Sequence, residues 1–313
     1  MTCTRLRSLP PAIAAALTLT LFAYTPAHAQ KIASVARPPA APAAPPARGF
    51  IWKAERAGKQ VWLLGSLHLL TPDFYPLPDS IEQAFARSDV LMEEIDMNEA
   101  SDPQFAAAVL SKAMNPPGVT LASQLSKETI ASVTAWLAKL GIGFDSLQAM
   151  KPWMVSVTVQ TVGLQRLGFD PAFGIDKHFQ DAATRANKQL LPLETALEQI
   201  NFLDGLSPKT QDLMLRQSVE SVETEQAEIK TIAAAWRAGD VATMERIALS
   251  DMKDSREVYD TLLAGRNRRW IPKIEACTQT RQSCFIVVGA AHLVGPDGLL
   301  ALLKQRGYTV TQQ

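Results

Sequence analysis

Two stretches far apart in the chain follow one pattern: Val61-Trp62-Leu63-Leu64-Gly65-Ser66-Leu67-His68 and Phe285-Ile286-Val287-Val288-Gly289-Ala290-Ala291-His292. Each is an apolar run that ends in a glycine, which is typical of a strand buried on both faces. A histidine follows three residues after each glycine, and a proline-primed helix and a further apolar run complete each unit. We therefore expect an α/β fold whose central mixed sheet is built from two related strand–GxxH–helix–strand halves.

Strands are expected at both ends of the chain. Residues 50–54 and 60–65 predict a hairpin that turns at Gly58. Residues 90–95 predict a strand that neighbours the first strand of the GxxH unit, and 308–311 predict a terminal strand. Open α/β sheets bind ligands beyond the carboxyl ends of their strands, which is where both histidines are expected.

The middle of the chain, from about residue 100 to 280, is mostly helical in pattern and predicts an insertion packed on the sheet. Asp102 and Ser126 are expected N-caps of two helices. Residues 153–167 are interpreted as a helix, although their valines also alternate as in a strand. Further elements are expected at 190–193 (a strand) and at 207–239, 254–275 and 296–306 (helices).

The first residues resemble a secretory signal peptide. Arg5 and Arg7 precede a short apolar run over 12–22, and Ala27-His28-Ala29 offers a small-residue cleavage site. We expect cleavage after Ala29 and a periplasmic or secreted protein, with an uncleaved anchor as the alternative.

Three segments follow from this interpretation. Residues 1–29 are the expected signal peptide. The proline- and alanine-rich stretch 30–48 is typical of an extended linker that buries nothing. Residues 49–313 are long enough for a single α/β domain that contains the helical insertion.

Charge and hydropathy exclude some partners. The chain has 31 basic and 31 acidic residues, so it lacks the excess of positive charge that is typical of nucleic-acid-binding proteins. No later stretch is long and apolar enough to span a membrane.

Two cysteines remain after the expected cleavage, Cys277 and Cys284, with six residues between them. In an oxidising compartment this spacing favours a disulfide that closes a short loop. Two cysteines without nearby histidines make a poor zinc site.

Three side chains are candidate metal ligands: His68, His292 and Glu94. Two histidines and a carboxylate can complete a three-ligand site with an open position for water, whose pKa the ion would lower. Strand alternation places Glu94 and Glu93 on opposite faces, so the sequence leaves open which of the two points inward. The alternative for Glu94 is a solvated acidic patch.

Candidate catalytic residues are Glu94, Glu194, Arg266 and its neighbour Asn267. Glu194 is a possible general base or ligand, and the alternative is an acid in the first turn of a helix. Arg266 is a possible oxyanion or carboxylate partner, and the alternative is a solvated basic run.

Asp176 is interpreted as an N-cap or as a partner that holds a ligating histidine, and His178 as an exposed helix residue.

The chain resembles the TraB/GumN family, which is related to the TIKI metalloproteases and more distantly to erythromycin esterase and ChaN-like proteins. The resemblance covers about residues 50–311. It is carried by the two GxxH stretches and by the following segments: Pro76-Leu77-Pro78, Ser88-Asp89-Val90-Leu91-Met92-Glu93-Glu94-Ile95-Asp96, Lys151-Pro152-Trp153, Gly174-Ile175-Asp176, Leu193-Glu194-Thr195 and Arg266-Asn267.

The resemblance implies a peptidase-like hydrolase that depends on a divalent metal, with Mn, Co or Zn as candidates and a peptide or other small amide or ester as substrate. Two alternatives stay open. One is a metal-independent, esterase-like hydrolase with a histidine as general base. The other is a non-enzymatic periplasmic protein that binds a ligand or metal.

Overall fold

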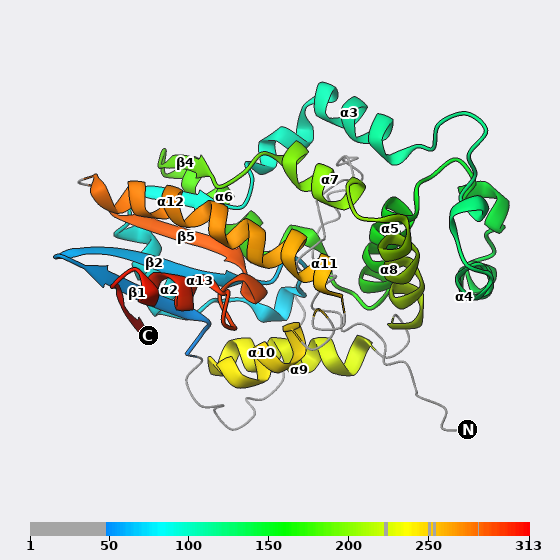
Figure 1. Ribbon diagram of the computed structural model, residues 1–313. Coiled ribbons are helices and arrows are strands. Elements are labelled where there is room, and N and C mark those ends of the chain that lie inside the picture. The colour runs from blue at the N-terminus through cyan, green and yellow to red at the C-terminus, as the bar shows by residue number, and fades with distance from the viewer. Residues whose placement is uncertain (1–47, 222–224, 250–251, 253–254, 281) are drawn as a thin grey trace, which may run out of the picture.

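A computed structural model describes residues 48–221, 225–249, 252, 255–280 and 282–313. The expected signal peptide and nearly all of the expected linker lie outside these residues. The fold is mixed α/β: one six-stranded sheet in the order β4-β3-β5-β2-β1-β6, with helices around it (Figure 1). The strands are β1 Ile51–Arg56, β2 Lys59–Ser66, β3 Val90–Glu93, β4 Gln189–Pro192, β5 Cys284–Gly289 and β6 Thr309–Gln312.

The sheet begins with the expected hairpin. Strands β1 and β2 pair antiparallel, and Arg56 lies opposite Lys59. The two residues between them, Ala57 and Gly58, have φ angles of 52° and 74°. Positive φ at both central positions is what a tight hairpin turn needs to match the twist of its strands.

The two GxxH units lie side by side because β2 and β5 pair in parallel, from Val61 opposite Cys284 to Ser66 opposite Gly289. The chain therefore leaves the sheet at the same edge after β2 and after β5, which is the geometry that the repeated pattern predicts. The expected pairing of β3 with the first strand is wrong. β3 pairs in parallel with β5 and β4, because the crossover through the first helix passes over β5.

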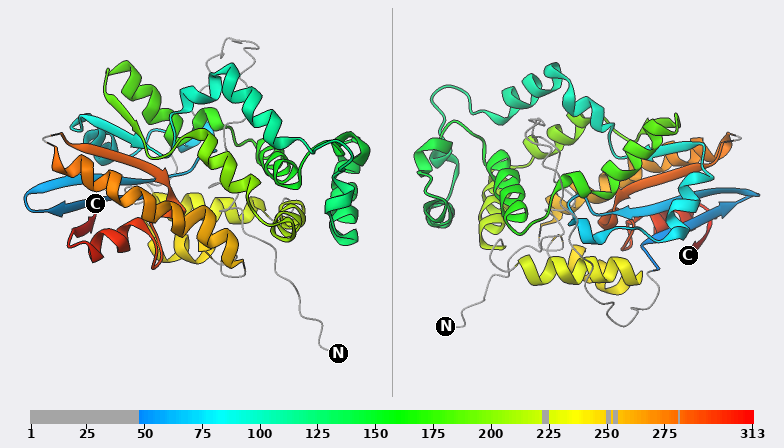
Figure 2. Two further views of the ribbon diagram at one scale, coloured as in Figure 1. Left: turned by 45° about the horizontal axis from the view of Figure 1, so that its top comes forward. Right: turned by 180° about the vertical axis from the view of Figure 1, so that it is seen from behind.

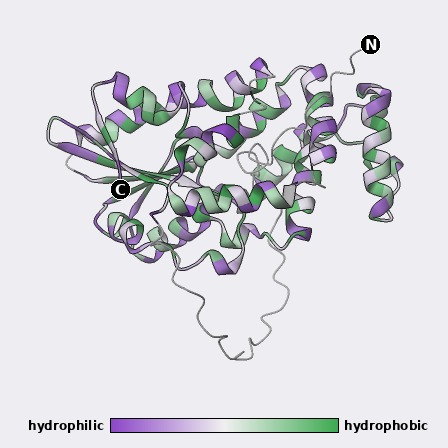
Figure 3. Cartoon of the chain, turned by 90° about the horizontal axis from the view of Figure 1, so that it is seen from below, coloured by the Kyte–Doolittle hydropathy of each residue, from purple (hydrophilic) through white to green (hydrophobic). Residues whose placement is uncertain are grey.

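Helices cover both faces of the sheet. Phe285 on β5 meets Phe85 of α2 (Asp79–Ala86) and Phe179 of α6 (Ile175–Arg185), with ring centroids 5.6 and 5.0 Å apart. The long helix α12 (Gly265–Gln279) runs along the other face beside α13 (Leu299–Gln305), as Figure 1 and the reverse view in Figure 2 show. Figure 3 shows apolar residues concentrated on the strands, whereas the helices carry both apolar and polar residues.

The region between β3 and β5 is helical apart from β4. Its α-helices are α3 Pro103–Ala113, α4 Lys127–Lys139, α5 Pro152–Arg166, α6, α7 Ala196–Asp204, α8 Pro208–Ser221, α9 Glu225–Ala238, α10 Val241–Leu249, α11 Arg256–Val258 and α12, with a π-helical turn Tyr259–Ala264 before α12. Helices α4, α5 and α8 build a second apolar core, in which Val133, Trp136, Val159 and Leu215 are buried. No helix among the described residues is long and apolar enough to cross a bilayer.

Most expected helices are present. Asp102 and Ser126 cap α3 and α4 through their side chains, and the ambiguous segment 153–167 is helix α5. The single helix expected over 207–239 is wrong in part, because the described residues there form α8 and α9. The last helix starts at Leu299 rather than near 296, after a turn at 295–298.

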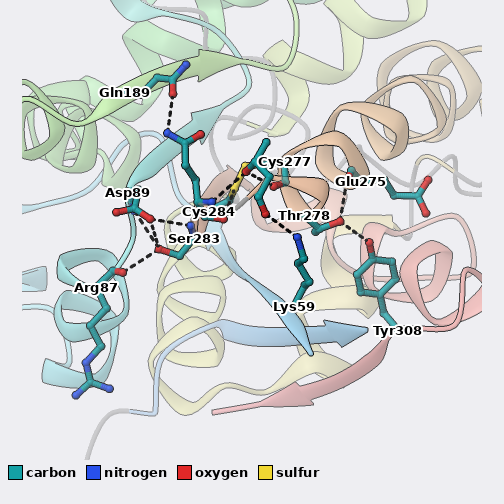
Figure 4. Close-up of a disulfide and its surroundings, with 12 residues drawn as sticks. Lys59, Arg87, Asp89, Gln189, Glu275, Cys277, Thr278, Ser283, Cys284 and Tyr308 are labelled. Atoms are coloured by element: carbon teal, nitrogen blue, oxygen red, sulfur yellow. Dashed lines mark hydrogen bonds between the residues drawn. A yellow bond between two sulfur atoms is a disulfide. The ribbon is translucent and has the colours of Figure 1, made fainter. Parts of the chain in front are cut away.

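The expected disulfide joins Cys277, at the end of α12, to Cys284, at the start of β5 (Figure 4). Neighbouring contacts tie this corner to two other strands. Lys59 of β2 donates to the carbonyl of Thr280 at 2.8 Å, and Ser283 donates its backbone N–H to Asp89 at 2.9 Å, just before β3.

We expect loss of this disulfide to lower the free energy of unfolding by about 2 kcal/mol, because it closes a short loop in the unfolded chain. Urea unfolding of the mature protein with and without dithiothreitol measures this. The Cys277→Ser/Cys284→Ser variant should already be destabilised and should not respond to dithiothreitol. Equal midpoints for the wild type in both buffers would contradict the prediction.

Candidate active site

His68 follows β2 and is held by a carboxylate. Its Nδ1–H donates to Asp176 Oδ2 at 2.6 Å, and the Ser66 hydroxyl donates to the same oxygen. Burial alone would lower the pKa of His68, but the charge and hydrogen bond of Asp176 outweigh it and raise the pKa to about 9. His68 is therefore an imidazolium at neutral pH, and its Nε2 side faces the rest of the site.

His292 follows β5 and is completely buried. Asn267 of α12 donates its amide N–H groups to the carbonyls of Asp297 and His292, at 2.8 and 3.2 Å, so its Oδ1 is left to accept from His292 Nδ1 at 2.6 Å. Burial lowers the pKa of His292 to about 3, so the ring is neutral. Its proton is on Nδ1, and the lone pair of Nε2 accepts a hydrogen bond from Arg266 Nη1 at 3.2 Å.

Glu94 lies just beyond β3 and is buried rather than solvated. Its Oε1 accepts from the backbone N–H of Gly289 at 2.8 Å, and its Oε2 accepts from Arg266 at 2.5 Å and Gln199 at 3.1 Å. Burial would raise its pKa, but Arg266, His292 and His68 together with the Gly289 N–H lower it to about 2. Glu94 is therefore ionised.

Arg266 is also buried and is not part of a solvated basic run. Its side chain pairs with both Glu94 and Glu194 and donates to the carbonyl of Leu262 at 3.2 Å and to His292. Glu194 is fully engaged as well, since Oε1 accepts from Arg266 and Oε2 accepts from Trp270 Nε1 at 3.1 Å. In this arrangement Glu194 holds Arg266 in place and is not a free base.

Gly289 marks the point where these groups meet. A Cβ atom added to Gly289 would lie 3.3 Å from Glu94 Oε1, 3.4 Å from His68 Nε2 and 3.6 Å from His292 Cδ2. All three side chains therefore face one small space that exists because residue 289 has no side chain. The structure brings together the three predicted ligands, with Arg266, Asn267 and Glu194 directly behind them.

The donor types suit a divalent ion once His68 has lost its Nε2 proton, because neutral imidazole nitrogen and carboxylate oxygen are ligands for Mn, Co and Zn. In both His68 and His292, Nδ1 is hydrogen-bonded to a side-chain oxygen, as it generally is in histidines that bind a metal through Nε2. Among the described residues, however, no three His, Cys, Asp or Glu side chains already stand as a metal-holding group. Arg266 Nη1 hydrogen-bonds His292 Nε2 at 3.2 Å, so this donor would have to exchange that partner for an ion.

Some residues near the site differ from expectation. Glu93 is buried on the opposite face, and neither carboxyl oxygen has a hydrogen-bond partner among the described residues, so burial raises its pKa well above the usual value. His178 is half-buried rather than exposed: it pairs with Glu82 at 2.8 Å, and its ring packs at a tilt against Tyr75.

Trp270 and Gln199 were not predicted. The spacing of Trp270 from Arg266, one helical turn, is the signal that could have suggested it.

The raised pKa of His68 predicts a pH-dependent stability. Because the folded pKa is about 9 and the unfolded value is 6.5, this contribution is complete below pH 6.5 and is lost as pH rises through 9. We expect the advantage of the wild type over His68→Gln in unfolding free energy to fall by about 3 kcal/mol or less between pH 6 and 9.5. Urea unfolding across this range checks it, and parallel curves for the two proteins would rule it out.

Comparisons with known proteins identify one family. A model of the TraB/PrgY/gumN family matches residues 50–312. The uncharacterized protein YbaP of Escherichia coli (strain K12) is 26% identical over 268 residues, which cover 81% of this chain and 97% of the relative, and YbaP of Shigella flexneri gives the same values. No solved structure matches the chain. On the match over 50–312, the chain belongs to the TraB/PrgY/gumN family.

Proposed function

We propose that the protein is an exported hydrolase that depends on a divalent metal and cleaves a peptide or another amide. The observation that carries the proposal is the convergence of His68 Nε2, Glu94 Oε1 and the His292 ring on the space beside Gly289. The disulfide supports export, because such bonds persist in oxidising compartments.

In this proposal His68, His292 and Glu94 hold the ion. When bound, it would polarise the substrate carbonyl and lower the pKa of a water molecule. The low pKa of Glu94 favours a role as ligand over a role as general base, because a carboxylate with a pKa of about 2 is a weak base near neutral pH.

The surrounding residues orient the ligands. Asp176 and Asn267 fix the rings of His68 and His292 through Nδ1, and this keeps both Nε2 atoms directed inward. Arg266 keeps Glu94 ionised. The oxyanion role predicted for Arg266 would require it to exchange one of its present contacts, since its N–H groups are already engaged.

Metal binding should compete with the proton on His68. Below pH 9 that proton must leave before Nε2 can bind an ion, whereas His292 is already neutral. We expect the apparent affinity for Mn²⁺ to rise about tenfold per pH unit up to about pH 9. Isothermal titration calorimetry in buffers of different ionisation enthalpy measures both affinity and proton release. A pH-independent affinity would remove His68 from the ligand set.

Gly289→Ala tests the space itself while keeping all three ligands. The added Cβ lies at or just inside ordinary contact distances, so we expect the variant to fold with little loss of stability but to lose Mn²⁺ binding and chelator-sensitive hydrolysis. Gly143→Ala is the matched control, because a Cβ there meets nothing within 4 Å. Undiminished binding in a folded Gly289→Ala protein would place the ion elsewhere.

One observation favours a metal-independent hydrolase as second candidate: Arg266 engages His292 Nε2. In that case His68, paired with Asp176, would act as the base, which requires its neutral form. Hydrolysis that resists chelator and increases as pH approaches 9 would support this alternative. Bound metal without turnover in a screen of peptides and esters would support the non-enzymatic alternative.

A further inference from the structure

Helix α12 carries four positively charged residues: Arg266, Arg268, Arg269 and Lys273. Three of them have partners. Arg266 is engaged in the candidate site, Arg268 pairs with Asp297 at 3.1 Å, and Lys273 donates to a backbone carbonyl at 2.6 Å. Arg269 has no hydrogen bond or ion pair within the described part of the chain. It is therefore the cation of α12 whose N–H groups are available to a ligand.

Arg269 is exposed, but two contacts restrain its guanidinium group. Its Cζ lies 4.6 Å from the ring centroid of Phe202 on α7, and Phe202 itself packs against the main apolar core. Its Nη1 lies 3.4 Å from the point that a Cβ atom of Gly265 would occupy. A guanidinium that stacks on an aromatic face keeps the N–H groups at its edge free to donate. Arg269 therefore presents oriented donors that have no partner in the protein.

The side chains of Arg266 and Arg269 run in the same direction along α12. Arg266 donates to the carbonyl of Leu262, and Arg269 lies over Gly265, each four residues earlier in the chain. Because both side chains point back by one turn, their guanidinium groups are separated by about the 5–6 Å that separates residues i and i+3. Since Arg266 contacts Glu94, Arg269 lies roughly one or two residues of extended peptide from the candidate site, at about 3.3–3.6 Å per residue.

Helix α7 contacts both places. Gln199 donates to Glu94 Oε2 at 3.1 Å, and Phe202, three residues later, stacks with Arg269. Residues three apart lie on one face of a helix, so the same face of α7 meets the candidate site and Arg269. Gln199 is half-buried whereas Glu94 is buried, so Gln199 lies on the solvent side of this carboxylate. The candidate site and Arg269 are therefore neighbours between α7 and α12.

The nearby carboxylate of Glu198 does not satisfy Arg269. Glu198 Oε2 accepts from the backbone N–H of Thr195 at 2.7 Å and from its hydroxyl, as part of the capping box of α7. No ion pair within 4.0 Å joins Glu198 to Arg269 in the described part of the chain. A carboxylate from outside the protein is the matching partner, because a guanidinium can donate two parallel N–H···O bonds to it.

We propose that Arg269 is a specificity residue that binds a carboxylate of the substrate, one or two residues from the amide that is cleaved. The position of that amide rests on the proposed function, whereas the binding of a carboxylate at Arg269 does not depend on it. In a peptide this carboxylate is either the chain end or an acidic side chain, and different probes separate the two sources.

The first test is binding without turnover. Hippurate, an amide with a carboxylate one residue away, is titrated into mature protein that carries ¹⁵N-labelled arginine, and hippuramide is the neutral control. We expect hippurate to shift the Nε–H signal of Arg269 and hippuramide to leave it unchanged. The signal of Arg268 is the control within the protein, because Arg268 is also exposed but already pairs with Asp297. The variants Arg269→Gln and Arg268→Gln assign the two signals.

The second test is turnover with Mn²⁺ present. A peptide with a free carboxyl terminus is compared with its carboxyl-terminal amide, and a peptide with an internal Asp is compared with its Asn counterpart. We expect the wild type to prefer the charged member of at least one pair by at least about tenfold in kcat/KM, as for a hydrogen bond to a charged group. Arg269→Gln should remove most of this preference, chiefly through KM. Arg268→Gln, which removes the same charge one residue away, should keep it.

The outcomes separate the two proposals. If no peptide is cleaved but hippurate shifts Arg269 as described, the proposed reaction fails and the carboxylate site stands. If hippurate leaves Arg269 unshifted, or shifts Arg268 equally, the carboxylate site is overturned. Metal-dependent cleavage with no preference in either pair, or with the same preference in wild type and Arg269→Gln, would overturn the carboxylate site and leave the proposed reaction intact.

Discussion

The structure depends on burying one guanidinium group. Arg266 lies inside the protein, and a charge in that position is tolerated only when it is paired and hydrogen-bonded. Glu94 from the end of β3, Glu194 from beyond β4 and the neutral ring of His292 together satisfy it. These partners come from three different strand ends, so pairing Arg266 requires α12 and those strand ends to be in place together.

The two GxxH units share a backbone geometry but provide opposite environments for their histidines. His68 meets a carboxylate, Asp176, and its pKa is raised to about 9. His292 meets a neutral amide, Asn267, beside a guanidinium, and burial lowers its pKa to about 3. One motif thus supplies a charged ring and a neutral ring facing the same space. The difference arises from the helices that cover each ring, α6 for His68 and α12 for His292.

The sheet also separates stabilising features from the candidate chemistry. At one end of β5 the disulfide, Lys59 and Ser283 tie the strands to α12 and to each other. At the other end β5 finishes at Gly289, where the backbone N–H binds Glu94 and the missing side chain leaves space. Strand β5 and helix α12 therefore connect the disulfide to the candidate site. The disulfide restrains the positions of Arg266 and Asn267, which lie on α12.

The sequence by itself determined the elements and the repeat. The apolar runs, Gly58, the caps at Asp102 and Ser126 and the duplicated GxxH pattern are local signals, and local propensity and alternation were enough to interpret them. The repeat also predicted that His68, His292 and Glu94 lie together, whereas only the tertiary structure decided how the groups around them are engaged. Whether Glu94 is solvated or buried, whether Glu194 is free or bound to Arg266, and which strand lies beside β3 all depend on contacts between residues about 70 to 200 positions apart. Periodicity along the chain carries no information about such distant pairs, because burial and pairing are set when separate elements pack together.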